Sequence, residues 1–73
     1  MKSACLFSGL GGWEIAASMN GVETVWAAEW DEWKRARYQE RWPNTPLYMD
    51  VGELDGRRLV RKHGPLDLIC ASP

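Results

Sequence analysis

The stretch Leu6-Phe7-Ser8-Gly9-Leu10-Gly11-Gly12 decides the fold class of this 73-residue chain. It joins an apolar run, residues 4–7, to a segment with helical periodicity. Three glycines in one turn suit a backbone that takes positive φ, or one that a ligand approaches without a Cβ in between. A strand that ends in such a turn and leads into a helix presents free N–H groups and the positive end of the helix dipole. The stretch therefore predicts a site for a nucleotide-like cofactor.

Segments with strand and helix patterns follow one another along the whole chain. Strands are predicted at residues 2–7, 22–29, 47–49 and 66–71, and helices at residues 12–20 and 31–42. Residues 51–63 are polar and basic, which predicts a loop with one or two helical turns. This order predicts an α/β fold with a sheet of about four parallel strands and right-handed crossovers. The chain then stops at the carboxyl end of a strand, where parallel sheets place their ligands, so we expect it to be part of a longer protein.

Both predicted helices carry residues that are expected to pack. The first has one apolar face, formed by Gly12, Ile15, Ala16 and Met19. The second carries three aromatic residues, Trp33, Tyr38 and Trp42, expected on the sheet or against parts of the protein outside this chain. The chain holds five tryptophans, more apolar surface than one small core needs. A chain of this size buries only about 60% of its unfolded surface.

The net charge of the chain bears on which kinds of partner it can bind. Nine basic and ten acidic side chains give a net charge of −1, which argues against a dedicated nucleic-acid clamp within the chain. The basic side chains of residues 51–63 and the single histidine, His63, are expected to be solvated. No signal peptide and no stretch of membrane-span length is present in the sequence, so a cytoplasmic location and no membrane partner are expected.

Two cysteines, Cys5 and Cys70, lie in separate apolar runs near opposite ends of the chain. We expect them to be buried thiols on neighbouring strands, in a reducing compartment. A disulfide between them is the alternative, and a metal site on two isolated cysteines is the least favoured reading. No metal site is therefore predicted.

Acidic residues stand at the ends of the next two predicted strands. Glu29 follows the glycine turn by about 20 residues, the place where a carboxylate binds ribose hydroxyls in Rossmann-like units. Trp30 after it can stack on an adenine ring, and Asp50 with Val51 can meet the adenine amino group. Each residue alone has an ordinary explanation: a helix cap, a turn residue or a core aromatic. In this order and at this spacing they predict an adenosine-shaped site.

The spacing of the glycines indicates which adenosine-containing cofactor the site would bind. A dinucleotide pattern G-x-G-x-x-G starting at Gly9 needs a glycine where Glu14 stands. A P-loop is excluded as well, because no Gly-Lys-Ser/Thr follows the turn. The remaining adenosine cofactor with a tight glycine turn is S-adenosylmethionine.

At this point the chain resembles the DNA cytosine-5 methyltransferases, and in particular their bacterial and phage members. Residues 6–12 look like the first motif of that family, residues 29–31 like its second, and Asp50-Val51 like its third. Residues 67–73 resemble the strand that leads into the family's Pro-Cys dipeptide. The resemblance covers almost the whole chain, with the motifs in the family's order. It implies a Rossmann-like S-adenosylmethionine-dependent methyltransferase fold, of which residues 1–73 form the first part, ending just before Pro-Cys.

The resemblance also assigns roles in binding S-adenosylmethionine. Phe7 would pack on the adenine, and Ser8, Gly9, Leu10, Gly11 and Gly12 would approach the methionine part. Glu29 would bind the ribose, Trp30 would contact the adenine, and Asp50 with Val51 would read its amino edge.

In this family a cysteine thiolate attacks C6 of a flipped-out cytosine, and the methyl group goes to C5. By the resemblance that cysteine lies beyond Pro73, so no catalytic residue is assigned within the chain, and double-stranded DNA would be held by other regions. Cys70 is not the nucleophile, and Cys5 stands where the family often has Asp. Residues 1–73 alone are therefore expected to be inactive.

Two alternatives remain open. The chain can be a non-catalytic cofactor-binding or interaction half of a split methyltransferase, completed by a second chain. A small nucleotide-binding oxidoreductase domain is the other, and the failed dinucleotide spacing weighs against it.

Overall fold

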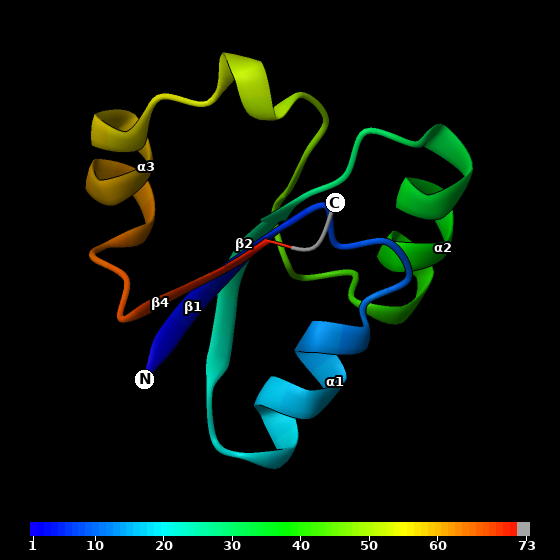
Figure 1. Cartoon of the computed structure of the whole chain (residues 1–73), viewed down its shortest axis with the longest axis horizontal. Coiled ribbons are helices and arrows are strands. Elements are labelled where there is room, and N and C mark those ends of the chain that lie inside the picture. Colours follow the sequence, from blue (N-terminus) through cyan, green and yellow to red (C-terminus); the bar gives the residue numbers. More distant parts are fainter. Residues whose placement is uncertain (72–73) are drawn as a thin grey trace.

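Four parallel strands form one sheet in the computed structural model, which describes residues 1–71 (Figure 1). The strands are β1 (Lys2–Leu6), β2 (Glu23–Ala28), β3 (Leu47–Tyr48) and β4 (Leu68–Ala71). Their order across the sheet is β3-β2-β1-β4, and each neighbouring pair is parallel. The predicted α/β fold is confirmed, with strands slightly shorter than expected. The sequence segment that resembles the family, residues 67–73, ends with Ser72 and Pro73, and these two residues lie outside the described part of the chain.

The helices are α1 (Gly12–Met19), α2 (Glu32–Arg41) and α3 (Gly56–His63), with a short 3₁₀ helix, η1 (Val51–Glu53). Figure 1 shows α1 and α2 on one side of the sheet and α3 on the other. Right-handed crossovers require this arrangement, because the chain moves outward from β1 to β3 and then returns past β1 to β4.

Local hydrogen bonds explain where two of the helices begin. The Asp31 carboxylate accepts from the backbone N–H of Lys34 at 2.9 Å and caps α2. Asp55 caps α3 in the same way, with the N–H of Arg57 at 3.0 Å. The loop predicted at residues 51–63 is therefore mostly helical: η1 and α3 take eleven of its residues, three and eight.

The core on the α3 side of the sheet is apolar. Ala4, Trp26 and Leu59 are buried there, and partly buried residues from β1, β2, β3 and the flanking loops pack around them. The rings of Trp26 and Tyr48 meet edge to face, with centroids 6.0 Å apart. These contacts hold α3 on the sheet.

The predicted packing face of α1 is wrong. Glu14 and Ala17 are the buried residues of the helix, whereas Ile15 is 39% exposed and Met19 is 80% exposed. The reason lies at the start of the helix, where the Glu14 carboxylate is hydrogen-bonded to Ser8 at 3.1 Å. That bond directs the Glu14 side chain inward, and the predicted apolar face with Ile15 and Met19 is left exposed.

Apolar side chains are also exposed on β4, where Leu68 is 39% and Ile69 is 63% exposed. β4 pairs only with β1 among the strands of residues 1–71, so its other edge has free backbone groups.

Within residues 1–71, no helix has the length and apolarity needed to cross a membrane.

Candidate functional site

The predicted binding residues meet at one edge of the sheet. Leu6, Ala28 and Tyr48, near the carboxyl ends of their strands, pair across β1, β2 and β3. The glycine turn follows β1 directly, and residues 29–30 and 50–51 follow β2 and β3. The strand order reverses beside β1, and ligands of open α/β sheets bind outside the carboxyl ends at such a point.

The backbone of the glycine turn takes positive φ at three residues: Phe7 (58°), Gly9 (59°) and Gly11 (91°). Left-handed φ is uncommon for a bulky residue such as Phe7, and such positions cluster at functional sites. The turn is tied to β2, because the Ser8 N–H donates to the Ala28 carbonyl at 3.0 Å. An added Cβ at Gly9 or at Gly12 would meet no atom within 4 Å. Space for a ligand is therefore open on this part of the turn.

Glu29 joins the turn to the start of α2. Its side chain is buried; one carboxylate oxygen accepts from the Gly9 N–H at 2.6 Å and the other from the Asp31 N–H at 2.8 Å. Hydrogen bonds to a carboxylate are stronger than those between neutral groups. An ionised carboxylate has about four acceptor sites, so Glu29 keeps capacity for a ligand hydroxyl.

The remaining predicted residues are accessible in different degrees. Trp30 is 66% exposed, and its carbonyl accepts from the Arg35 guanidinium at 2.7 Å. Asp50 and Val51 are half-buried, and Asp50 Oδ1 accepts from the Gly52 N–H at 2.8 Å, which caps η1. Phe7 is 38% exposed. Two aromatic rings and two carboxylates thus follow the carboxyl ends of β1, β2 and β3, and of the two carboxylates Glu29 bonds to the turn, whereas Asp50 bonds within its own loop.

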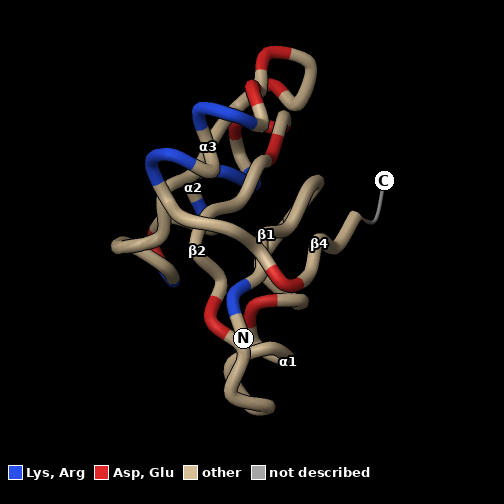
Figure 2. The backbone as a smooth tube through the Cα atoms, turned by 90° about the vertical axis from the view of Figure 1, so that its left-hand side faces the viewer, with Lys and Arg blue, Asp and Glu red and all other residues tan. Residues whose placement is uncertain are grey.

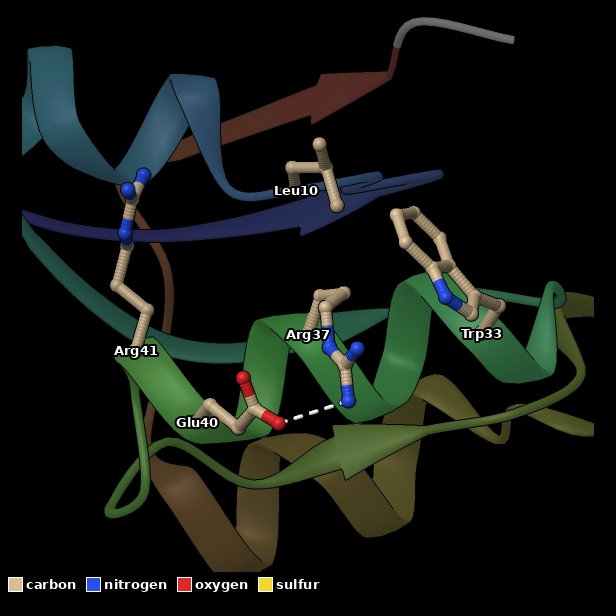
Figure 3. Close-up of a pocket in the computed structure, with 5 residues that line it drawn as sticks. All are labelled: Leu10, Trp33, Arg37, Glu40 and Arg41. Atoms are coloured by element: carbon tan, nitrogen blue, oxygen red, sulfur yellow. Dashed lines mark hydrogen bonds and ion pairs between the residues drawn. The ribbon is translucent and has the colours of Figure 1, made fainter.

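A cleft of about 420 Å³ lies beside this edge, between the turn and α2 (Figure 3). It is lined by Leu10, Trp33, Arg37, Glu40 and Arg41, so Leu10 is its single member from the predicted site. The Arg37 guanidinium lies over the Trp33 ring, 5.5 Å from its centroid, and pairs with Glu40 at 2.7 Å. Trp33 is 60% exposed, so it does not pack on the sheet, and its packing against parts of the protein outside this chain stays a prediction. A second cleft, about 460 Å³, lies between β3 and α3, away from the turn.

The other two aromatic residues of the second helical segment do pack inward. Tyr38 is fully buried, and Trp42, at the end of α2, is half-buried with its indole nitrogen against Gly11. The sequence patterns predict packing for both residues, and the contact between Trp42 and the turn is an addition from the structure.

The two cysteines lie on neighbouring strands, as predicted, with Cys5 and Cys70 in register on β1 and β4. Both are free thiols; Cys5 is buried as predicted, whereas Cys70 is only half-buried. Burial raises the pKa of Cys5 to about 12, and the nearby Glu14 and Cys70 add to the effect. A thiol held protonated in this way is a poor nucleophile. Within residues 1–71, no group of three or more metal-binding side chains comes together.

Alkaline pH is expected to destabilise the chain. Burial raises the pKa of Cys5 from 9.0 to about 12 and raises that of Tyr38 above its usual 10.0. The unfolded chain loses these protons first as pH rises, so the stabilisation is complete below pH 9 and declines between about pH 9 and pH 12. Thermal unfolding followed by circular dichroism at a series of pH values checks this. A Tm that stays constant above pH 9 contradicts it, and Cys5→Ala should weaken the dependence.

His63 is less exposed to solvent than the sequence predicts. It is half-buried, and its Nε2 lies 2.7 Å from the Tyr48 hydroxyl. Burial, and then the neighbouring Lys62, lower the pKa of His63. The basic residues of α3 are exposed, as predicted. Figure 2 shows their positions in blue along that helix.

Fold and site together define the amino-terminal portion of a Rossmann-like methyltransferase: a glycine turn after β1, with acidic residues after β2 and β3. The chain belongs to the C-5 cytosine-specific DNA methylase family, whose model matches residues 1–73. A solved structure of a DNMT2 variant from the insect Spodoptera frugiperda is similar, with 28% identity and a TM-score of 0.83. The match covers 99% of this chain and 22% of that one, so the chain spans about a fifth of that relative's length. Curated proteins give no match.

Proposed function

We propose that this chain is the cofactor-binding part of a DNA cytosine-5 methyltransferase, which transfers a methyl group from S-adenosylmethionine to C5 of cytosine in double-stranded DNA. The observation that carries the proposal is the buried Glu29 carboxylate after β2, which bridges the N–H groups of Gly9 and Asp31 and so connects the turn after β1 to the start of α2. Membership of the methylase family supports the reaction class. The bound cofactor would supply the methyl group.

The residues at the sheet edge fit the adenosyl cofactor. Glu29 has acceptor sites left for ribose hydroxyls. The exposed rings of Phe7 and Trp30 offer apolar faces for adenine, with Asp50 and Val51 at its amino edge. The open space at Gly9 and Gly12 lets the methionine part approach the turn, which also includes Ser8, Leu10 and Gly11.

We further propose that the nucleophile comes from outside residues 1–73, after the strand that leads toward Pro-Cys. Neither cysteine of the chain suits the role: Cys5 is buried with its pKa raised to about 12, and Cys70 lies within β4, in register with it. The small share of the matched relative's length that the chain covers supports a larger catalytic unit. The chain alone would then transfer no methyl group to DNA, which a radiolabelled methyl-transfer assay measures.

Calorimetric titration tests the cofactor assignment. S-adenosylmethionine and S-adenosylhomocysteine are expected to bind with a Kd of about 1 mM or tighter, which corresponds to about −4 kcal/mol. NAD should bind at least about tenfold more weakly, because Glu14 occupies the place of the third dinucleotide glycine. Equal heats for NAD and S-adenosylhomocysteine would contradict the assignment.

A split methyltransferase, in which a second chain completes the domain, is favoured by one observation. The exposed Leu68 and Ile69 on β4, a strand with one partner among the described strands, suit a covering neighbour. Mixing this chain with a polypeptide that carries the Pro-Cys motif would then restore methyl transfer, and neither part alone would give it. Activity restored only by a continuous chain favours a single polypeptide.

A further inference from the structure

A cluster of polar groups lies at the glycine turn, formed by the buried residues Ser8, Glu14 and Tyr38 and by the buried indole nitrogen of Trp42. The Glu14 side chain is 2% exposed, and its Oε1 accepts from the Ser8 hydroxyl at 3.1 Å. The same hydroxyl lies 3.2 Å from the Cys5 carbonyl, so two acceptors share its single hydrogen. Ser8 also bonds through its backbone to Ala28, as described above. The carboxylate thus holds a residue at the centre of the turn.

The second carboxylate oxygen of Glu14 is buried without a hydrogen-bond partner, and two donors from the α2 segment are in the same state. Glu14 Oε2, Trp42 Nε1 and the Tyr38 hydroxyl are each buried, and none has a hydrogen-bond partner within residues 1–71. Trp42 Nε1 and Glu14 Oε2 lie around the same point, since an added Cβ at Gly11 would collide with the first and lie 3.5 Å from the second. The Tyr38 hydroxyl lies beside the Glu14 carboxylate, whose charge adds to the burial that raises the pKa of Tyr38. Two unpaired donors from the α2 segment therefore lie in the same buried region as one unpaired acceptor from α1.

We propose that Glu14 is a positioning residue for the glycine turn: its carboxylate fixes the turn through Ser8 and draws the polar groups of Tyr38 and Trp42 against it. The side chain lies under the turn, away from the open side at Gly9 where a ligand would approach. An ionised carboxylate only accepts hydrogen bonds, and the other three polar side chains of the cluster, Ser8, Tyr38 and Trp42, can each donate one. The effect on cofactor affinity rests on the proposed function, whereas the effect on the turn does not.

Glu14→Gln separates the acceptor role from packing, because glutamine keeps the size and shape but replaces one acceptor by a donor. In the ¹⁵N-labelled chain, the amide resonances of Gly9 and Gly11 and the indole N–H of Trp42 should shift. Amides of α3, across the sheet, should not. The affinity for S-adenosylhomocysteine should fall about tenfold. Glu32→Gln is the matched control, since Glu32 is exposed on α2, and it should change neither reading.

Each outcome decides between positioning and simple structural support. A folded Glu14→Gln variant with unshifted glycine resonances overturns the proposal, as does a lower Tm with unchanged affinity. If the unaltered chain binds no S-adenosylhomocysteine, the proposed function fails, and the resonance shifts alone decide on positioning. If Glu14→Gln does not fold, Tyr38→Phe and Ser8→Ala replace it, each removing one donor with little loss of volume. Both should shift the Gly11 amide, and an unshifted amide in both overturns the proposal.

Discussion

Gly11→Ala is expected to destabilise the chain by about 2–5 kcal/mol and to abolish binding of S-adenosylhomocysteine. Gly11 has φ 91°, a conformation that costs a residue with a Cβ about 1–2 kcal/mol. The new methyl group would also collide with the Trp42 indole nitrogen and come within 3.1 Å of its Cδ1. Trp42 cannot move without disturbing the polar cluster under the turn. Thermal unfolding followed by circular dichroism measures the loss of stability.

Two other glycines provide matched controls for Gly11. Gly21→Ala shares the positive φ, 73°, but the added Cβ meets nothing within 4 Å, so it should cost the conformational part alone. Gly12→Ala, in the first turn of α1 with open space around it, should be neutral or slightly stabilising, because alanine favours a helix over glycine. A loss at Gly11 no larger than the loss at Gly21 would show that the contact with Trp42 is unimportant.

Glu29→Ala is the second change with a large expected effect. It removes the acceptors of two backbone N–H groups, at 2.6 and 2.8 Å, which connect the turn to the start of α2. Hydrogen bonds to charged groups contribute about 1.5–3 kcal/mol each, so stability should fall by about 3 kcal/mol. Binding of S-adenosylhomocysteine should weaken at least about 100-fold, because the turn loses its anchor and the ribose its acceptor. Chemical denaturation and calorimetry measure the two effects.

Glu29→Gln gives a graded comparison. Because it keeps one acceptor oxygen, it should lose less stability and less affinity for S-adenosylhomocysteine than Glu29→Ala. The exposed Glu53→Ala variant should change neither quantity. If Glu29→Ala lowers stability and leaves the affinity unchanged, Glu29 is a structural residue only, and the ribose assignment is wrong.

Much of the sheet and the arrangement of its edge followed from the sequence. Strand-ending carboxylates such as Glu29 and Asp50 are visible as acidic residues directly after apolar runs, and parallel topology brings their backbone positions together. The glycine turn was visible because few residues other than glycine accept its backbone conformation. These features depend on local patterns and on one topological rule.

The polar cluster under the turn could not be predicted in the same way. Periodicity on α1 favoured burying Ile15 and Met19, whereas a hydrogen bond from Ser8 draws Glu14 inward. That bond depends on the three-dimensional path of the turn, and its one signal in the sequence is Glu14, a charged residue at the third position of the helix. The sequence predicts only one or two helical turns in the segment that contains α3, for a related reason. Most residues of α3 are charged, and the helix depends on one cap, Asp55, and one buried apolar residue, Leu59.

The position of bound S-adenosylhomocysteine is the most direct test of the cofactor site. Amide chemical shifts of the ¹⁵N-labelled, unaltered chain, recorded alongside the calorimetric titration, locate the ligand residue by residue. We predict shifts at Gly9, Gly11, Glu29, Trp30 and Asp50, at the carboxyl ends of β1, β2 and β3, and none along α3. Shifts confined to the cleft between β3 and α3, or no shifts at saturating ligand, would contradict a cofactor site at the glycine turn.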